Sequence, residues 1–389
     1  MALQGYAFRP DYAIPPGETL LEVLQDLDMT QKELALRMGR PQKTINEIIK
    51  GKAAITPETA LQLENVLGTP ASFWGNRERQ YRETLARLEA EAEVKSSVGL
   101  VDEFPVAEMV KRGWLPKCKT KPDKLRSLLS YFGVGSPTEL RSFGDIRRYA
   151  FREAARGKKT GARLAWLRRG EVLGQEVECA PFSRGRFESA LCSAKEMTHM
   201  QPRGFWSPLQ RELAGSGVAC VFIPSFPGMG LHGAARWVGT EKVLLMLSSH
   251  YKWSDQFWFS FYHEAAHILL HGKKEVFLEM EDGEDQGEVE ANRWAADFLL
   301  PPDILGRLRK EGRLARQVII DYAHEAGVAP GIVVGRLQRE RRLPYRTPLN
   351  NLKTTLDWSF LESECGGKDS SGGGSPQSAA ASGVKGRPV

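Results

Sequence analysis

Residues 263–267 read His-Glu-Ala-Ala-His, and this spacing sets the strongest limit on how the chain can fold. His263 and His267 can bind one metal ion together only if the segment is a helix, where residues four apart share a face. Asp255 is a possible N-cap of that helix, and Gly272 is a possible C-cap. Glu264 lies beside the two histidines, where it can take a proton from a metal-bound water. The motif therefore predicts a zinc-binding helix with Glu264 as the general base.

A catalytic zinc ion has three protein ligands and one open position, so the third ligand must lie outside the motif. A metzincin-type scheme needs glycine and then histidine farther along the same helix, but leucine and lysine stand at these places. A gluzincin-type scheme uses a glutamate on a following helix, and residues 287–301 supply one. Glu288 and Glu290 lie on nearly opposite sides of this helix. Trp294 and Phe298 are expected to face inward, and Ala291 is a further candidate for this side. Because this arrangement puts Glu290 on the packed side, we predict Glu290 as the third ligand.

The two segments 263–267 and 290–301 together resemble the ImmA/IrrE metallopeptidase family. The resemblance covers about residues 215–345 and implies a small zincin-like domain with a short sheet beside the motif helix. It implies the same metal ligands and the same general base, and it adds Asn292 and Asp297 as supporting residues. A working peptidase and a metal-binding domain that cuts no peptide are both compatible with these motifs.

Several further residues near the motif have more than one possible role. His232, His250 and Tyr251 precede the motif helix and are candidates for stabilising an oxyanion, and the sequence does not choose among them. His271 could extend the row of ligands, but its place at the helix end favours a supporting or surface role. The acidic stretch 275–285 is expected either to form a rim that favours basic substrates or to control access to the metal.

A second motif lies near the N-terminus, at residues 29–51. Thr30 and Glu33 form a capping box that starts a helix, and Gly39 provides the tight turn that ends it. A second helix at 41–50 turns its isoleucines inward and its polar side chains outward, which suits the major groove of DNA. The candidate DNA-contacting residues are Gln31, Arg40, Gln42, Lys43, Thr44, Asn46 and Lys50.

This N-terminal segment resembles the XRE-type helix-turn-helix family, in the variant found in HigA-like antitoxins, over about residues 15–75. The resemblance implies a DNA-binding repressor in a toxin–antitoxin or mobile-element setting. Acidic residues between 18 and 28 offset the basic ones, so one copy would bind double-stranded operator DNA weakly and a homodimer is expected. A helical bundle that contacts only proteins is the alternative.

The expected fold is mainly α-helical with a smaller α+β part. Strands are expected at 218–223, 233–238 and 242–248, just before the motif helix. The expected parts are an N-terminal arm (1–14), a helix-turn-helix domain (15–76), a helical connecting region (77–214), a zincin-like domain (215–345) and a C-terminal tail (346–389), disordered from about 370.

Composition limits the classes of protein that remain. A chain of 389 residues fits about two to three domains, and it has no apolar run long enough to cross a bilayer. The five cysteines are scattered, which argues against a disulfide framework, and no secretory signal is visible. We therefore expect a cytoplasmic protein with zinc as its cofactor and no membrane partner. The basic stretch 111–169 fits either nucleic-acid contact or, more simply, solvated helices.

These observations predict a DNA-binding transcriptional regulator whose zinc-dependent peptidase domain cuts a protein partner: a repressor, a toxin or the chain itself. The alternative is a HigA-type antitoxin that represses its own operon and neutralises a cognate toxin by binding, with the zincin domain as scaffold or sensor. The intact Glu264 favours the peptidase, because a glutamine at this position would have removed the base.

Overall fold

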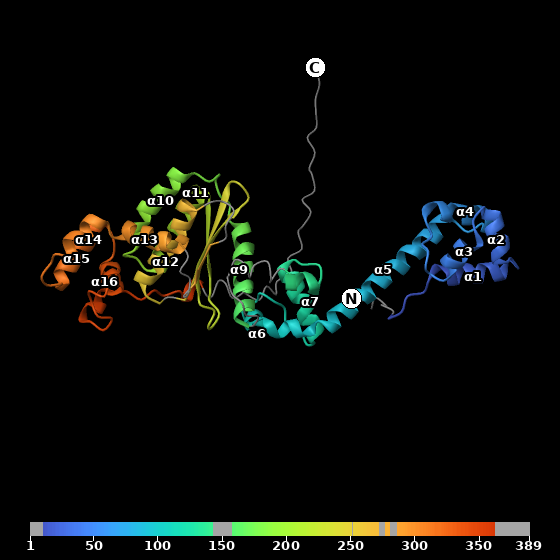
Figure 1. Ribbon diagram of the computed structural model, residues 1–389, viewed down its shortest axis with the longest axis horizontal. Helices are drawn as coiled ribbons and strands as arrows, with labels where there is room; N and C mark the ends of the chain where they lie inside the picture. Colours follow the sequence, from blue (N-terminus) through green and yellow to red (C-terminus); the bar gives the residue numbers. More distant parts are fainter. Residues whose placement is uncertain (1–10, 143–157, 251, 272–276, 281–285, 362–389) are drawn as a thin grey trace, which may run out of the picture. The chain divides into compact units, whose positions relative to one another are not determined.

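The structure of the chain is a computed structural model that describes residues 11–142, 158–250, 252–271, 277–280 and 286–361. The chain forms two compact units (Figure 1). The first comprises Met1–Gly99 with Gly135–Thr138, and the second comprises Leu100–Val134 with Glu139–Val389. Each unit has its own hydrophobic core.

The first unit is all helical, with α1 (Pro16–Asp26), α2 (Gln31–Met38), α3 (Gln42–Ile49), α4 (Pro57–Leu67) and α5 (Ala71–Ser96). The Thr30 hydroxyl accepts the Glu33 backbone N–H at 3.2 Å, so the predicted cap starts α2. Gly39 ends α2 at φ 64°, a left-handed conformation that glycine adopts without strain. Leu34 of α2 and Ile45 of α3 are fully buried in one core, which holds the two helices of the predicted motif together.

Helices precede the sheet in the second unit. They are η1 (Val98–Glu103, which begins in the first unit), α6 (Val106–Lys111), α7 (Lys121–Phe132), α9 (Lys158–Glu176), α10 (Arg184–Met197) and α11 (Pro202–Gly215). Most of them fall within residues 77–214, the range expected from the sequence to form a helical connecting region. In the structure, however, α9 lies against β1 and β3, and the indole N–H of Trp166 donates to the Ile223 carbonyl at 3.0 Å. Residues 158–215 are therefore part of the sheet domain.

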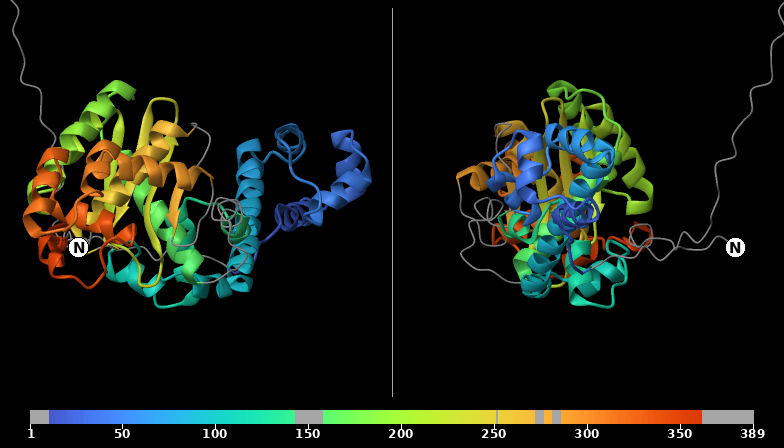
Figure 2. Two further views of the ribbon diagram at one scale, coloured as in Figure 1. Left: turned by 60° about the vertical axis from the view of Figure 1, so that its left-hand side comes forward. Right: turned by 90° about the vertical axis from the view of Figure 1, so that its right-hand side faces the viewer.

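The sheet has four strands, β1 (Val218–Ile223), β2 (Leu231–Val238), β3 (Lys242–Ser248) and β4 (Phe277–Met280), in the order β1-β3-β2-β4. β1 pairs parallel with β3, and the other pairings are antiparallel. Helices cover both faces of the sheet (Figure 2). In β3, Leu244 and Met246 face α9, whereas the intervening Leu245 belongs to the core that contains the motif helix. The predicted strands are present, and β4 is an addition.

The C-terminal elements are α12 (Ser254–Leu270), α13 (Gln286–Leu299), α14 (Pro302–Leu308), α15 (Arg316–Ala326), α16 (Pro330–Arg339) and η2 (Pro348–Leu352). The N-cap of α12 is Trp253, not the predicted Asp255, whose carboxylate instead pairs with Lys353 at 2.6 Å. Leu356 and Trp358 are buried in the main core, so residues up to 361 are not a tail. The expected mainly α-helical fold with a smaller α+β part is confirmed.

Within the described part of the chain, every helix is too short or too polar to span a lipid bilayer.

Candidate metal centre and nucleic-acid interface

The two motif histidines lie one turn apart on the buried side of α12. Their Nε2 atoms are 2.9 Å apart, and both side chains are fully enclosed. Burial lowers the pKa of His267, and the hydrogen bond with Glu288 opposes this effect only in part. The neutral imidazole is therefore favoured, and this is the form that binds metals.

Glu288, at the start of α13, completes a three-residue cluster with the histidines. Its carboxylate oxygens lie 3.1 Å from His263 Nε2 and 3.4 Å from His267 Nε2. The three donor atoms lie within 4.8 Å of one another. Burial raises the pKa of the Glu288 carboxyl, but hydrogen bonds with the two histidines lower it more, and the resulting pKa is about 2. Two imidazole nitrogens and one carboxylate form a donor set that suits a catalytic zinc ion.

The structure does not bring Glu290 to this cluster, and the prediction of Glu290 as third ligand is corrected. The Glu290 side chain is 52% exposed, and its Oε2 lies 3.5 Å from His271 Nε2. It also accepts a hydrogen bond from the Gln286 side chain at 3.2 Å. Glu290 therefore contacts His271 and is not part of the cluster formed by His263, His267 and Glu288.

The reason lies in the face that α13 buries. Its fully buried residues are Ala291, Ala295 and Leu299. Glu288 precedes Ala291 by three residues and shares this face, whereas Trp294 and Phe298 are only partly buried. The large aromatic residues suggested the wrong inner face. The small residues at a helical spacing were the sequence signal for Glu288.

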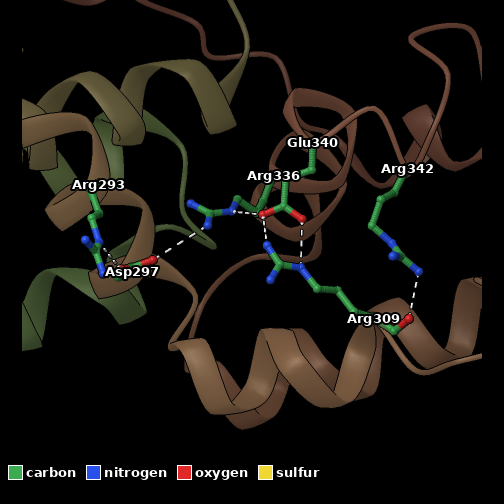
Figure 3. Close-up of polar contacts among 6 residues, drawn as sticks. All are labelled: Arg293, Asp297, Arg309, Arg336, Glu340 and Arg342. Atoms are coloured by element: carbon green, nitrogen blue, oxygen red, sulfur yellow. Dashed lines mark hydrogen bonds and ion pairs between the residues drawn. The ribbon is translucent and has the colours of Figure 1, made fainter. Parts of the chain in front are cut away.

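Hydrogen bonds hold the outer nitrogen of each imidazole. His263 Nδ1 lies 3.1 Å from the Asn292 side-chain oxygen, which can accept its proton. His267 Nδ1 lies 3.0 Å from His271 Nδ1, and His271 in turn contacts Glu290. Protons on the Nδ1 atoms leave both Nε2 atoms free to bind a metal. Asp297, which the resemblance also suggested, instead pairs with Arg336 at 3.6 Å and Arg293 at 3.7 Å (Figure 3).

The carboxylate of Glu264 is fully buried and lies over β2. A Cβ atom added at Gly233 would come within 2.7 Å of Glu264 Oε1, so glycine at this position leaves the space that the carboxylate occupies. Nothing in the sequence pointed to this role of Gly233. Helix α12 and strand β2 together fix the position of the Glu264 carboxylate.

His232 is the oxyanion candidate that reaches the cavity beside the metal ligands. The pairing of β2 with β4 shifts register between Leu231 and Gly233, so His232 is an extra residue on the β2 side. Such bulges redirect side chains. The His232 ring lines the same cavity as His263 and Glu288, and it stacks on His250 at 4.4 Å between ring centroids. The third candidate, Tyr251, lies outside the described residues.

The cavity has a volume of about 640 Å³ and is lined by residues of α12, α13 and α16 and by segments near 345 and 353. Leu299, Leu300 and Ile332 give the cavity an apolar part. His263 and Glu288, two members of the three-residue cluster, line another part of it. Its size suits a short peptide segment or another ligand of similar size. Of the acidic stretch 275–285, only the backbone of β4 is described, so the expected rim lies outside the described residues.

The predicted DNA-contacting residues lie on and around α3. Gln42, Lys43, Asn46 and Lys50 are exposed, whereas Gln31 and Thr44 are partly buried. The guanidinium group of Arg40 donates to the Gln62 side chain and pairs with Glu58 at 3.3 Å. Arg40 therefore contacts α4, and the exposed polar residues on α3 and at its C-terminal end are Gln42, Lys43, Asn46 and Lys50.

Comparisons with known proteins agree with this division. A helix-turn-helix family model matches residues 20–74, and an IrrE N-terminal-like domain model matches residues 221–338. An HTH-type transcriptional regulator of Escherichia coli, YddM, is 33% identical over 79 residues, which are 20% of this chain and 82% of that protein.

Two solved structures are similar over about one fifth of the chain. An addiction-module antidote protein of the HigA family from Coxiella burnetii is 33% identical, with 22% of this chain and 92% of that chain covered and a TM-score of 0.21. The Pseudomonas aeruginosa antitoxin HigA, solved with the higBA promoter, is 30% identical, with coverage of 19% and 83% and a TM-score of 0.19. The chain belongs to the helix-turn-helix family of DNA-binding transcriptional regulators, and its second unit contains an IrrE-like domain with a metallopeptidase-like fold.

Proposed function

We propose that this chain is an operator-binding regulator whose second unit is a zinc-dependent endopeptidase acting on a protein partner. The observation that carries this proposal is the convergence of His263, His267 and Glu288 beside a cavity, with the buried Glu264 next to them. Two imidazoles, one carboxylate and a neighbouring second carboxylate are the set of groups that zinc-dependent hydrolysis requires.

The described donor set fits zinc, because nitrogen and carboxylate ligands at three positions leave a fourth open. When bound, zinc lowers the pKa of a coordinated water and polarises a carbonyl group. Residues of the chain carry out the proton transfers and bind the peptide. Glu264 accepts the proton of the attacking water at its carboxylate and returns it to the leaving amine. His232, which lines the same cavity, is the residue we assign to donate a hydrogen bond to the developing oxyanion, and the cavity holds the peptide.

The proposal is tested with a chymotryptic peptide library from a bacterial lysate, with the product of the adjacent gene and with the chain itself. New peptide termini are expected with zinc-loaded protein and not after removal of zinc by a chelator, as read by mass spectrometry. If no substrate is cut while the adjacent gene's product binds tightly, the peptidase proposal fails and the antitoxin alternative replaces it.

Asn292→Ala is expected to weaken zinc binding by roughly 10–100-fold, because His263 Nδ1 loses the oxygen that fixes its ring. Competition with a chromogenic chelator measures the dissociation constant. Arg293→Ala, at the next and exposed position, is the control and should bind zinc like the wild type. Equal zinc affinity in both variants would show that Asn292 does not support the ligand.

The exposed face of α3 leads to a prediction for DNA binding by a homodimer at a palindromic operator near its own promoter. Gln42→Ala should cost about 1–3 kcal/mol and relax sequence preference, because glutamine can read a base edge. Lys43→Ala should weaken all sequences more evenly, since a lysine at the backbone neutralises phosphate. Lys95→Ala, near the far end of the 26-residue α5, is the charge-matched control. A gel-shift titration with promoter and random DNA measures both effects, and equal binding of the two DNAs would contradict the proposal.

A further inference from the structure

Basic residues outnumber acidic residues in the lining of the cavity beside His263 and Glu288. The charged residues that line it are Asp255, Glu288, Arg293, Arg336, Arg339 and Lys353. Lys353 and Asp255 neutralise each other at 2.6 Å, with both side chains largely buried. Glu288 belongs to the metal ligands. The rest of the charged lining consists of three arginines, which we call the arginine wall.

Arg336 is the fixed member of the arginine wall. Its guanidinium group is held by Glu340 at 2.8 Å and by Asp297 at 3.6 Å (Figure 3). Burial raises the pKa of Glu340, but hydrogen bonds with Arg309 and Arg336 lower it more, so Glu340 stays ionised. Neither Glu340 nor Asp297 lines the cavity. The two carboxylates, which lie outside the cavity lining, therefore fix the guanidinium group of Arg336, a residue that lines the cavity.

Arg339 is the member whose charge is available to a ligand. It follows Arg336 by three residues on α16, lines the cavity and is exposed. No acidic side chain in the described ranges forms an ion pair or hydrogen bond with it, whereas Arg293 is paired with Asp297 at 3.7 Å. Asp297 pairs with both Arg293 and Arg336, and Glu340 is shared between Arg336 and Arg309. The charge of Arg339 is not offset in this way, and a net positive charge remains at the cavity surface.

We propose that the arginine wall binds an aspartate or glutamate side chain of the peptide substrate, close to the bond that is cut. The inference rests on the proposed peptidase function and gives its substrate class. Arginine binds a carboxylate through two parallel hydrogen bonds, which gives both affinity and orientation. The apolar part of the cavity, with Leu299 and Ile332, takes an adjacent apolar residue. This preference is opposite to the one that the acidic stretch 275–285 suggested from sequence.

The test uses two fluorescent hexapeptides that differ only in having glutamate or lysine at two positions between leucines. The full-length, zinc-loaded Glu264→Gln variant prevents cleavage, and fluorescence anisotropy measures the dissociation constants. The acidic peptide should bind about 10–100-fold more tightly, as expected for charge-assisted hydrogen bonds. Arg339→Glu should abolish or reverse this preference. Arg313→Glu makes the same charge change at an exposed position away from the cavity and should retain it.

Three outcomes overturn the inference: equal binding of the two peptides, tighter binding of the lysine peptide, or equal losses in the Arg339 and Arg313 variants. Displacement of the acidic peptide by ATP at concentrations below the dissociation constant of the peptide also overturns it, because the arginine wall would then be a nucleotide site. Failure of the peptidase proposal is seen separately, as the absence of cleavage of the peptide library by zinc-loaded wild type.

Discussion

Glu288→Ala is expected to strip zinc from the purified chain, whereas Glu290→Ala should retain close to one zinc per chain. Glu288 is the carboxylate that lies within 3.4 Å of both histidine Nε2 atoms, and Glu290 is on the other side of α13. The loss for Glu288→Ala should exceed the roughly 10–100-fold typical of a residue that only supports a ligand. His263→Ala should lose zinc as completely.

The two glutamate variants are matched controls for each other, because they remove the same side chain two positions apart on one helix. Metal content is measured by mass spectrometry after dialysis against a buffer of fixed free zinc concentration. Far-ultraviolet circular dichroism establishes that both variants are folded. Zinc loss in Glu290→Ala with retention in Glu288→Ala would restore Glu290 as the third ligand.

Glu264→Gln is expected to reduce peptide cleavage by about 10²–10⁴-fold while zinc content stays unchanged. Glutamine keeps the size of the side chain over Gly233 but cannot accept the proton of the attacking water. The measurement is kcat on one peptide identified from the library, with wild type and variant at equal zinc content. Equal rates would remove Glu264 from the mechanism, and a parallel loss of zinc would instead make it structural.

The approach of His263 to His267 could be predicted from the sequence because its geometry is local. A spacing of four residues on a helix is sufficient to bring the two histidines together, whatever surrounds them. The third residue of the cluster comes from another helix, and its identity depends on which face of α13 packs inward. Bulky aromatic residues are a poor guide to that face, because they can be half-buried at its margin.

Other features escaped prediction for a different physical reason. The bulge at His232 arises from pairing with β4, a strand of four residues that is too short to show an alternating pattern. Residues 353–361 have no clear periodicity, yet Leu356 and Trp358 fill the core beside α12. Irregular segments of this kind are ordered by the surfaces they pack on. Those surfaces form only in the folded protein, so they cannot be identified from the sequence of the segment.

The hydrophobic cores described for the two units share no residues, so the two units can melt separately. Each unit can unfold as a cooperative block of its own, so calorimetry should resolve two transitions. A ligand raises the melting temperature only of the block that binds it, by an amount set by its concentration and dissociation constant. Operator DNA and zinc should therefore shift different melting transitions. If one ligand shifts both transitions, the size of the second shift measures how strongly DNA binding is coupled to the state of the peptidase-like unit.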